Sequence, residues 1–100
     1  MTHLRTRAVH AGQQPDPTTG AIATPITQTT AFGYGTLERG AALFAGEVPG
    51  YRYSRFANPT VASLEAKLAD LQGAQSTVTF ASGTAATASL VLSLLRPGDE

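Results

Sequence analysis

One stretch, residues 76–95, constrains the fold of this 100-residue chain more than any other. Val78 and Phe80 alternate with threonines, a pattern that predicts a short β-strand over Ser76–Ala81. An Ala- and Leu-rich segment follows directly, and we expect it to be helical from about Thr84 to Leu95. One strand cannot form a sheet by itself. We therefore expect the amino-terminal piece of a larger α/β protein, with a complete small domain as the alternative.

The junction between this strand and this helix is a candidate anion site. The first backbone N–H groups of a helix have no partner inside the helix, and the helix dipole makes that end partly positive. Gly83 lets a ligand approach the backbone, while the hydroxyl groups of Ser82 and Thr84 can add hydrogen bonds. Phosphate is the anion that such a site suits best. Most strand-to-helix turns bind nothing, so this interpretation needs support from elsewhere in the chain.

A second candidate lies at residues 51–56. If this segment is extended, alternation places Tyr53 and Arg55 on one face, together with Tyr51. A phenol and a guanidinium two residues apart can then hold one oxyanion, since arginine supplies a planar fork of donors and tyrosine one more. The opposite face would carry Arg52, Ser54 and Phe56. The alternative is a surface strand with ordinary packing of arginine against aromatic rings.

Capping signals predict three further helices, over Thr2–Ala11, Leu37–Ala45 and from Pro59 to Gly73. The third carries an apolar stripe that we expect to be buried: Val61, Leu64, Leu68 and Leu71. Its charged residues, Glu65, Lys67 and Asp70, are expected to face solvent. The last helix is apolar on most sides, which predicts burial between layers.

Residues 13–35 are rich in Pro, Gly and Thr, and Pro15 and Pro17 forbid a helix interior there. We expect either an arm that lies on another surface, such as a second subunit, or a long surface loop.

Composition narrows the classes of function. Seven basic and seven acidic residues give a formal net charge of zero, which does not favour a nucleic-acid partner. Without cysteine there is no disulfide and no thiolate metal site, and the isolated His3 and His10 do not favour a metal centre. No signal peptide or membrane span is recognisable, so a soluble, cytoplasmic protein is the expectation.

Taken together, the motifs resemble the amino-terminal part of a known family, the pyridoxal-phosphate (PLP) enzymes of cysteine and methionine metabolism (trans-sulfuration enzymes). The resemblance covers nearly the whole chain and rests on Thr6–Gly12, Pro25–Phe32, Gly50–Thr60, Leu64-Glu65, Ala81–Ala86 and Leu95–Glu100. The family includes cystathionine γ-synthase, cystathionine γ-lyase, methionine γ-lyase and the O-acyl-homoserine sulfhydrylases.

The resemblance implies an α/β fold, that of a fold-type I PLP-dependent transferase with a mixed, mostly parallel sheet covered by helices. Residues 1–57 would form an amino-terminal arm and subunit-contact segment, and residues 58–100 would begin the PLP-binding large domain. The backbone N–H groups of Gly83 and Thr84 would bind the cofactor phosphate, with the Ser82 side chain nearby. Tyr53 and Arg55 would reach the same phosphate from the neighbouring subunit. Tyr53 would also lie near the catalytic centre, where its phenol can assist proton handling.

The implied reaction is elimination or replacement at the γ-carbon of a homoserine ester or sulfur amino acid. An O-acyl-homoserine sulfhydrylase is preferred, with methionine or cystathionine γ-lyase as the alternative. The implied assembly is a homotetramer, a dimer of dimers with shared active sites. The Schiff-base lysine and the substrate-binding arginine would lie beyond Glu100, so residues 1–100 alone are expected to be inactive. Many members have Met where this chain has Thr84. A hypothesis of another class is a non-catalytic phosphate-binding or interaction module.

Overall fold

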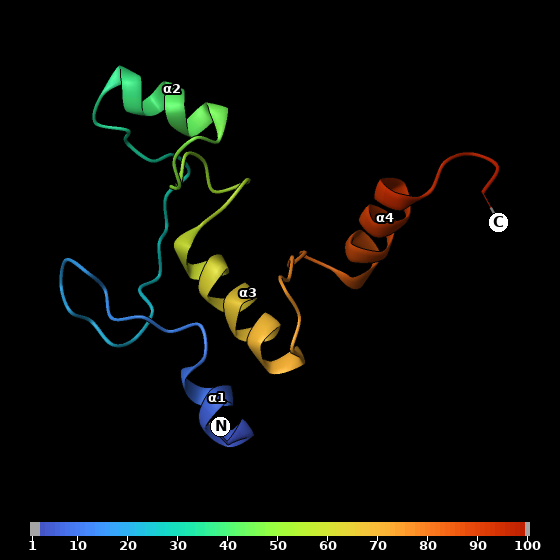
Figure 1. Ribbon diagram of the computed structural model, residues 1–100, viewed down its shortest axis with the longest axis horizontal. Coiled ribbons are helices and arrows are strands. Elements are labelled where there is room, and N and C mark those ends of the chain that lie inside the picture. Colours follow the sequence, from blue (N-terminus) through green and yellow to red (C-terminus); the bar gives the residue numbers. More distant parts are fainter. Residues whose placement is uncertain (1–2, 100) are drawn as a thin grey trace.

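The computed structural model describes residues 3–99, in which four helices are joined by long irregular segments (Figure 1). The helices are α1 (Leu4–His10), α2 (Leu37–Ala45), α3 (Pro59–Gln72) and α4 (Gly83–Leu94). The radius of gyration is 16.7 Å, whereas a compact domain of this length has about 13 Å. The chain is therefore extended, with α4 standing away from the other helices (Figure 1).

The helix ends follow the predicted capping signals closely. The Thr36 hydroxyl accepts a hydrogen bond from the Arg39 N–H at 3.1 Å, and α2 ends at Gly46, whose φ is +77°. In α3, the Asn58 side chain accepts from the Thr60 N–H at 2.9 Å, and Gly73 closes the helix with φ +66°. Both glycines adopt the left-handed conformation that glycine reaches at little steric cost.

The first helix differs from its prediction at both ends. It begins after His3, whose side chain makes no capping hydrogen bond, and it ends at His10. The predicted cap, Thr2, lies outside the described residues. Gly12 comes after the helix end and has φ +72°. A Cβ atom there would lie 2.4 Å from the Ser63 carbonyl oxygen, so this residue marks a close approach of two backbones.

The predicted strand over Ser76–Ala81 is wrong for this structure, because no strand is assigned within residues 3–99. A strand exists only when its backbone N–H and C=O groups pair with a neighbouring strand, and the described residues offer this segment no such neighbour. One isolated antiparallel bridge, between Ala31 and Tyr53, is the β-pairing present in the described part of the chain.

Helix α3 holds the other segments through its polar side chains. Asp70 pairs with Arg7 of α1 at 2.8 Å, and the Lys67 amino group donates to the Val9 carbonyl at 2.9 Å. Glu65 accepts hydrogen bonds from the Thr79 N–H and hydroxyl, at 2.9 and 3.0 Å. Asp70 is exposed as expected, whereas Glu65 and Lys67 are partly buried, so the expectation that they face solvent is wrong for these two residues.

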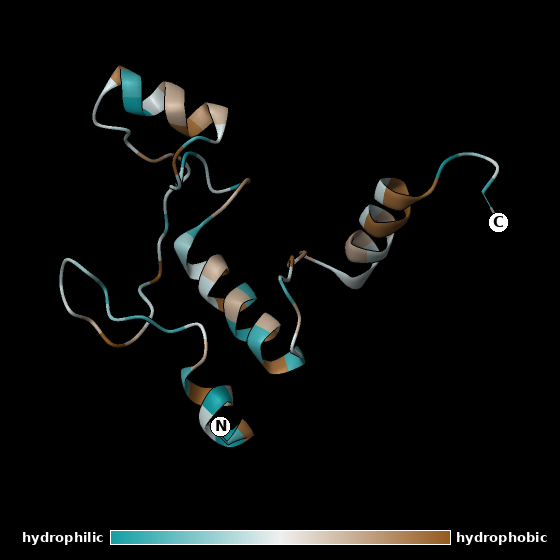
Figure 2. Cartoon of the chain, viewed as in Figure 1, coloured by the Kyte–Doolittle hydropathy of each residue, from teal (hydrophilic) through white to brown (hydrophobic). Residues whose placement is uncertain are grey.

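Apolar side chains are mostly exposed. Leu43 and Ala69 form the buried apolar core of the described residues, whereas Val61 and Leu64 of the predicted stripe are exposed. The burial expected for α4 is also not found: Leu92 is 82% exposed and Leu94 is 70% exposed. Figure 2 shows this helix as a hydrophobic element with no other helix beside it. Its apolar surface, unlike that of a core helix, is not covered by the described residues.

Candidate functional site

The amino terminus of α4 has the geometry expected of an anion site. The Ser82 hydroxyl accepts a hydrogen bond from the Ala85 N–H at 3.1 Å, which fixes the first turn and leaves the hydroxyl proton free to be donated outward. The N–H groups of Gly83 and Thr84 donate no hydrogen bond to any described residue. Both residues are exposed, so three donors converge on an open surface.

The backbone at Gly83 is unobstructed. A Cβ atom placed on this residue would meet nothing within 4 Å in the described chain. Ser82, just before it, is extended, with φ −153° and ψ 157°. A ligand atom can therefore come close to the helix terminus without displacing protein atoms, and the positive end of the helix dipole favours a negative one.

The second candidate, Tyr53 with Arg55, forms a pair that is brought together by a turn. The predicted alternation extends only to Tyr53, because the chain turns through residues 54–56 and the Tyr53 carbonyl accepts from the N–H groups of Phe56 and Ala57. The Arg55 guanidinium carbon lies 4.9 Å from the centre of the Tyr53 ring. The phenol and the guanidinium are thus neighbours, although the backbone geometry differs from a regular strand.

Both arginines of the segment pack against aromatic rings. The Arg52 guanidinium carbon is 4.6 Å from the centre of the Phe56 ring and 5.1 Å from that of Phe44. The Arg55 guanidinium carbon, besides its contact with Tyr53, is 5.7 Å from the centre of the Phe56 ring. These are the distances of ordinary cation–π packing. The alternative proposed for the segment therefore describes contacts of both arginines, and Arg52 connects the segment to Phe44 of α2.

A buried amide connects the Tyr53 segment to the arm, by which we mean residues 13–35, and to α3. The Asn58 side chain is 8% exposed, and its Nδ2 donates to the Thr27 carbonyl and to the Ser54 hydroxyl, both at 3.0 Å. The Ser54 hydroxyl in turn donates to the Thr29 carbonyl. We call Asn58, Ser54 and these two carbonyl groups the amide clasp. The sequence identified Asn58 only as a helix cap, and nothing local to it indicated the two donor bonds.

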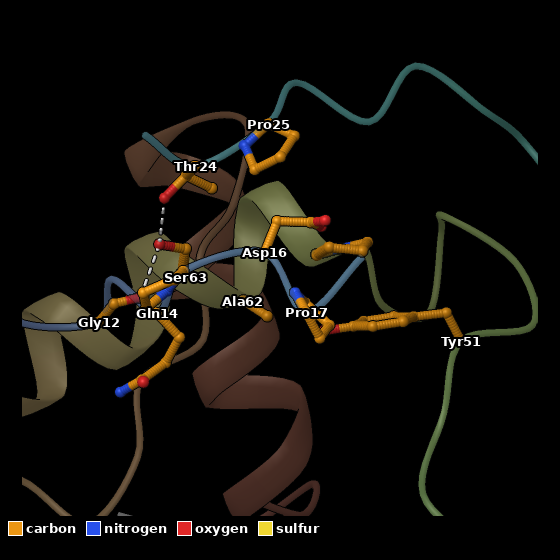
Figure 3. Close-up of a pocket in the computed structure, with 11 residues that line it drawn as sticks. Gly12, Gln14, Asp16, Pro17, Thr24, Pro25, Tyr51, Ala62 and Ser63 are labelled. Carbon is orange, nitrogen blue, oxygen red and sulfur yellow. Dashed lines mark hydrogen bonds between the residues drawn. The ribbon is translucent and has the colours of Figure 1, made fainter. Parts of the chain in front are cut away.

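The arm continues along α3 through further hydroxyl groups. The Ser63 hydroxyl lies between the Gly12 carbonyl, at 2.8 Å, and the Thr24 hydroxyl, at 3.0 Å (Figure 3). A pocket of about 370 Å³ opens beside this contact, and its lining includes four prolines together with Tyr51 and Asp16. It contains none of the predicted site residues, so it is separate from both candidate anion sites.

The structure does not bring the two candidate sites together within this chain. Tyr53 and Arg55 belong to the segment that packs against the arm, whereas Ser82–Thr84 lie at the start of the isolated α4 (Figure 1). No hydrogen bond between them is present in residues 3–99. Within the same residues, no group of three metal-ligating side chains occurs, and none of the helices has the length and hydropathy to cross a membrane.

Comparison with known proteins gives a consistent result. The family model described as Cys/Met metabolism PLP-dependent enzyme matches residues 5–100. L-methionine γ-lyase of Pseudomonas putida is 48% identical over 95 residues, which cover 95% of this chain and 24% of that protein. O-acetyl-L-homoserine sulfhydrylase of Corynebacterium glutamicum is 46% identical over 96 residues, which cover 96% of this chain and 22% of that protein.

Among solved structures, a protein from Campylobacter jejuni described as an O-acetylhomoserine (thiol)-lyase superposes with a TM-score of 0.91 at 34% identity. The match covers 99% of this chain and 24% of that one, whose structure carries N′-pyridoxyl-lysine-5′-monophosphate. The expected fold, the amino-terminal portion of a fold-type I PLP enzyme, is thereby confirmed. The chain spans about a quarter of the length of these relatives. It belongs to the family of PLP-dependent enzymes of cysteine and methionine metabolism.

Proposed function

We propose that this chain supplies the cofactor-phosphate site of a PLP enzyme that eliminates or replaces a group at the γ-carbon of an amino acid. The observation that carries the proposal is the start of α4, where the N–H groups of Gly83 and Thr84 are unpaired in the described chain and exposed. Its helix dipole and the Ser82 hydroxyl add to the attraction for a phosphate dianion.

The residues present fit PLP by the chemistry of their donors. Backbone N–H groups, a serine hydroxyl, a phenol and a guanidinium are all hydrogen-bond donors, and none of them places a negative charge at the phosphate. When bound, PLP serves as the electron sink of such reactions. The contribution of this chain is to hold and orient the phosphate end.

We propose further that Tyr53 and Arg55 reach this phosphate from a neighbouring subunit. Their separation from Ser82–Thr84 within the chain supports that arrangement (Figure 1). It implies that an active site needs two copies of the chain, in a dimer or a dimer of dimers. In the same arrangement the Tyr53 phenol would lie close enough to the reacting atoms to accept or donate a proton.

Within the family, the preferred activity is that of an O-acyl-homoserine sulfhydrylase. The O-acetyl-L-homoserine sulfhydrylase of Corynebacterium glutamicum and the structurally similar Campylobacter jejuni protein support this choice. The second candidate is a γ-lyase, favoured by the 48% identity to the Pseudomonas putida L-methionine γ-lyase. In the first reaction a sulfur nucleophile replaces the γ-substituent, whereas in the second the γ-substituent is eliminated and the amino acid is deaminated, so the two are separable by product.

The test uses the complete protein that contains this chain. Borohydride reduction followed by peptide mapping should find pyridoxyl label on a lysine; a protein that takes up no PLP would support the non-catalytic phosphate-binding module instead. With O-acetylhomoserine and sulfide, a sulfhydrylase releases acetate and forms homocysteine. With methionine and water, a γ-lyase releases methanethiol, ammonia and 2-oxobutanoate. The faster of the two reactions, compared as kcat/KM, decides between the candidates.

A further inference from the structure

The amide clasp connects two parts of the chain that are distant in sequence, residues 27–29 and residues 54–60. The Asn58 Oδ1 accepts from the Thr60 N–H at 2.9 Å, while its Nδ2 donates to Thr27 and Ser54. The amide thus uses both its acceptor and its donor in a nearly buried position, at 8% exposure. A buried amide that is fully paired fixes the geometry of its partners, since any displacement leaves a polar group unsatisfied.

The Ser54 side of the clasp sets the position of Tyr53. The Ser54 N–H donates to the Thr30 carbonyl at 2.8 Å, and the bridge between Ala31 and Tyr53 continues the same pairing. Ser54 is the first residue of the turn that follows this bridge, and its hydroxyl group is held by Asn58 and by the Thr29 carbonyl. The clasp therefore holds the residue directly after Tyr53, at the point where the paired segment ends.

We propose that Asn58 is a positioning residue for the pair Tyr53 and Arg55. Through Ser54 it fixes the register of the bridged segment and the start of the turn that places Arg55 over the Tyr53 ring. Asn58 does not itself touch the cofactor. The inference rests on the proposed function, because it assigns to the clasp the task of aiming these two donors at the PLP phosphate.

An amide is the side chain that this position requires. Aspartate would keep the cap, because its carboxylate can accept from the Thr60 N–H. It would, however, place a second acceptor opposite the Thr27 carbonyl and could no longer donate to Ser54. Asn58→Asp therefore separates the positioning role from the capping role, which is the simpler explanation for an asparagine before a helix.

The experiment compares the affinities of the complete apo-protein for PLP and for pyridoxal, which lacks only the phosphate. The dissociation constant for pyridoxal divided by that for PLP gives the preference for PLP, which measures the phosphate contacts. This ratio does not change when the binding of both ligands is weakened by the same factor. The variants are Asn58→Asp, Ser54→Ala and, as a reference for lost phosphate contacts, Arg55→Ala. Ser63→Ala is the matched control, because it removes hydrogen bonds between the arm and α3 without touching Ser54.

We expect Asn58→Asp and Ser54→Ala to lower the preference for PLP by about tenfold, the size of one lost charge-assisted hydrogen bond. Ser63→Ala should change it by less than about twofold. If Asn58→Asp fails to fold, Ser54→Ala decides the question alone. The inference is overturned if Arg55→Ala lowers the preference for PLP over pyridoxal while Asn58→Asp and Ser54→Ala leave that preference unchanged. Equal weakening of both ligands by Asn58→Asp and Ser54→Ala leaves the preference unchanged and overturns the inference as well. A parent protein with no preference for PLP over pyridoxal overturns the proposed function itself.

Discussion

The guanidinium carbon of Arg55 lies 4.9 Å from the centre of the Tyr53 ring, within the range of a favourable cation–π contact. The contact places two hydrogen-bond donors side by side. The same chain carries the start of α4, to which this pair makes no hydrogen bond in residues 3–99. The proposed function therefore has the pair reach the phosphate from a neighbouring subunit.

Mixed dimers provide the most direct test of this arrangement. Arg55→Ala and Gly83→Pro should each weaken PLP binding when present in both subunits, because each removes donors from every site. In a heterodimer of the two variants, one site combines Arg55 from one chain with Gly83 from the other. We therefore expect about one PLP per heterodimer in a spectroscopic titration, at a concentration where both parent variants bind little.

Two affinity tags allow the heterodimer to be purified away from both homodimers. If Tyr53 and Arg55 instead acted on the α4 of their own chain, both sites of the heterodimer would be damaged. Binding no better than that of the parent variants, in a verified heterodimer, would therefore contradict the shared site.

Gly83→Pro also isolates the contribution of a single backbone N–H group. Gly83 is the first residue of α4, a position that proline favours, and Ser82 before it already has the extended conformation that proline requires. The variant should keep its thermal stability without cofactor yet bind PLP at least about tenfold more weakly. Gly83→Ala retains the N–H, and its Cβ meets nothing within 4 Å in the described chain, so it is the matched control. Equal affinities of Gly83→Pro and Gly83→Ala for PLP would show that the Gly83 N–H group does not bind the phosphate.

Gly12 and Gly20 allow a clash between backbones to be separated from strain at a positive φ. Both have φ +72°, but only at Gly12 would a Cβ atom meet other atoms, 2.4 Å from the Ser63 carbonyl oxygen and 2.7 Å from the Lys67 nitrogen. Alanine at either position costs about 1 kcal/mol or more for the left-handed conformation. Gly12→Ala should be more destabilising still, by about 1–3 kcal/mol, as measured by denaturant unfolding. Similar values for Gly12→Ala and Gly20→Ala would mean that the arm is not seated on α3 as described.

The turn at Asp16 should respond to acid. Hydrogen bonds from the Thr19 backbone N–H and hydroxyl, and from the Thr18 N–H, hold the pKa of the Asp16 carboxyl below its usual value. A carboxyl whose pKa is lower when folded stabilises the turn above its unfolded pKa, and this stabilisation is lost as the pH falls through the folded pKa. Carbon-13 NMR of labelled aspartate should show one resonance that titrates below the pKa of aspartate in an unstructured peptide and that is missing in Asp16→Asn. An Asp16 signal that titrates at the peptide value would disprove the turn.

The helices could be predicted from the sequence because their ends depend on local chemistry. Thr36 and Asn58 are the predicted caps, and each accepts the expected backbone hydrogen bond. Ser82 caps α4 in the same way, although the pattern predicted only a ligand-binding role for it and a helix start at about Thr84. Gly46 and Gly73 end their helices in the left-handed conformation, as the pattern predicted. The donors of Ser82–Thr84 follow from the same local rule, since every helix start leaves its first N–H groups unpaired.

What could not be predicted depends on partners that are distant in sequence. The polar face of α3 was assigned to solvent, yet Glu65 holds Thr79 and Lys67 holds the Val9 carbonyl. Periodicity shows which residues share a face but not what lies opposite that face. The prediction of a strand over Ser76–Ala81 was wrong for the same reason. Alternation indicates a segment that is suited to a strand, but a strand forms only when a neighbouring strand pairs with it. The amide clasp could not be predicted either, because the partners of Asn58 include a carbonyl group 31 positions away in the sequence.

The exposed apolar surface of α4 has a consequence for biosynthesis. The links between segments in the described chain are mostly hydrogen bonds and one ion pair, which contribute little net stability where water can replace them. Leucines such as Leu92 and Leu94 hold apolar area whose burial could drive folding. While that area is uncovered on the ribosome, the nascent chain is a substrate for chaperones and prone to aggregation. We therefore expect this part of the protein to become stable at the same time as the apolar surface of α4 is buried.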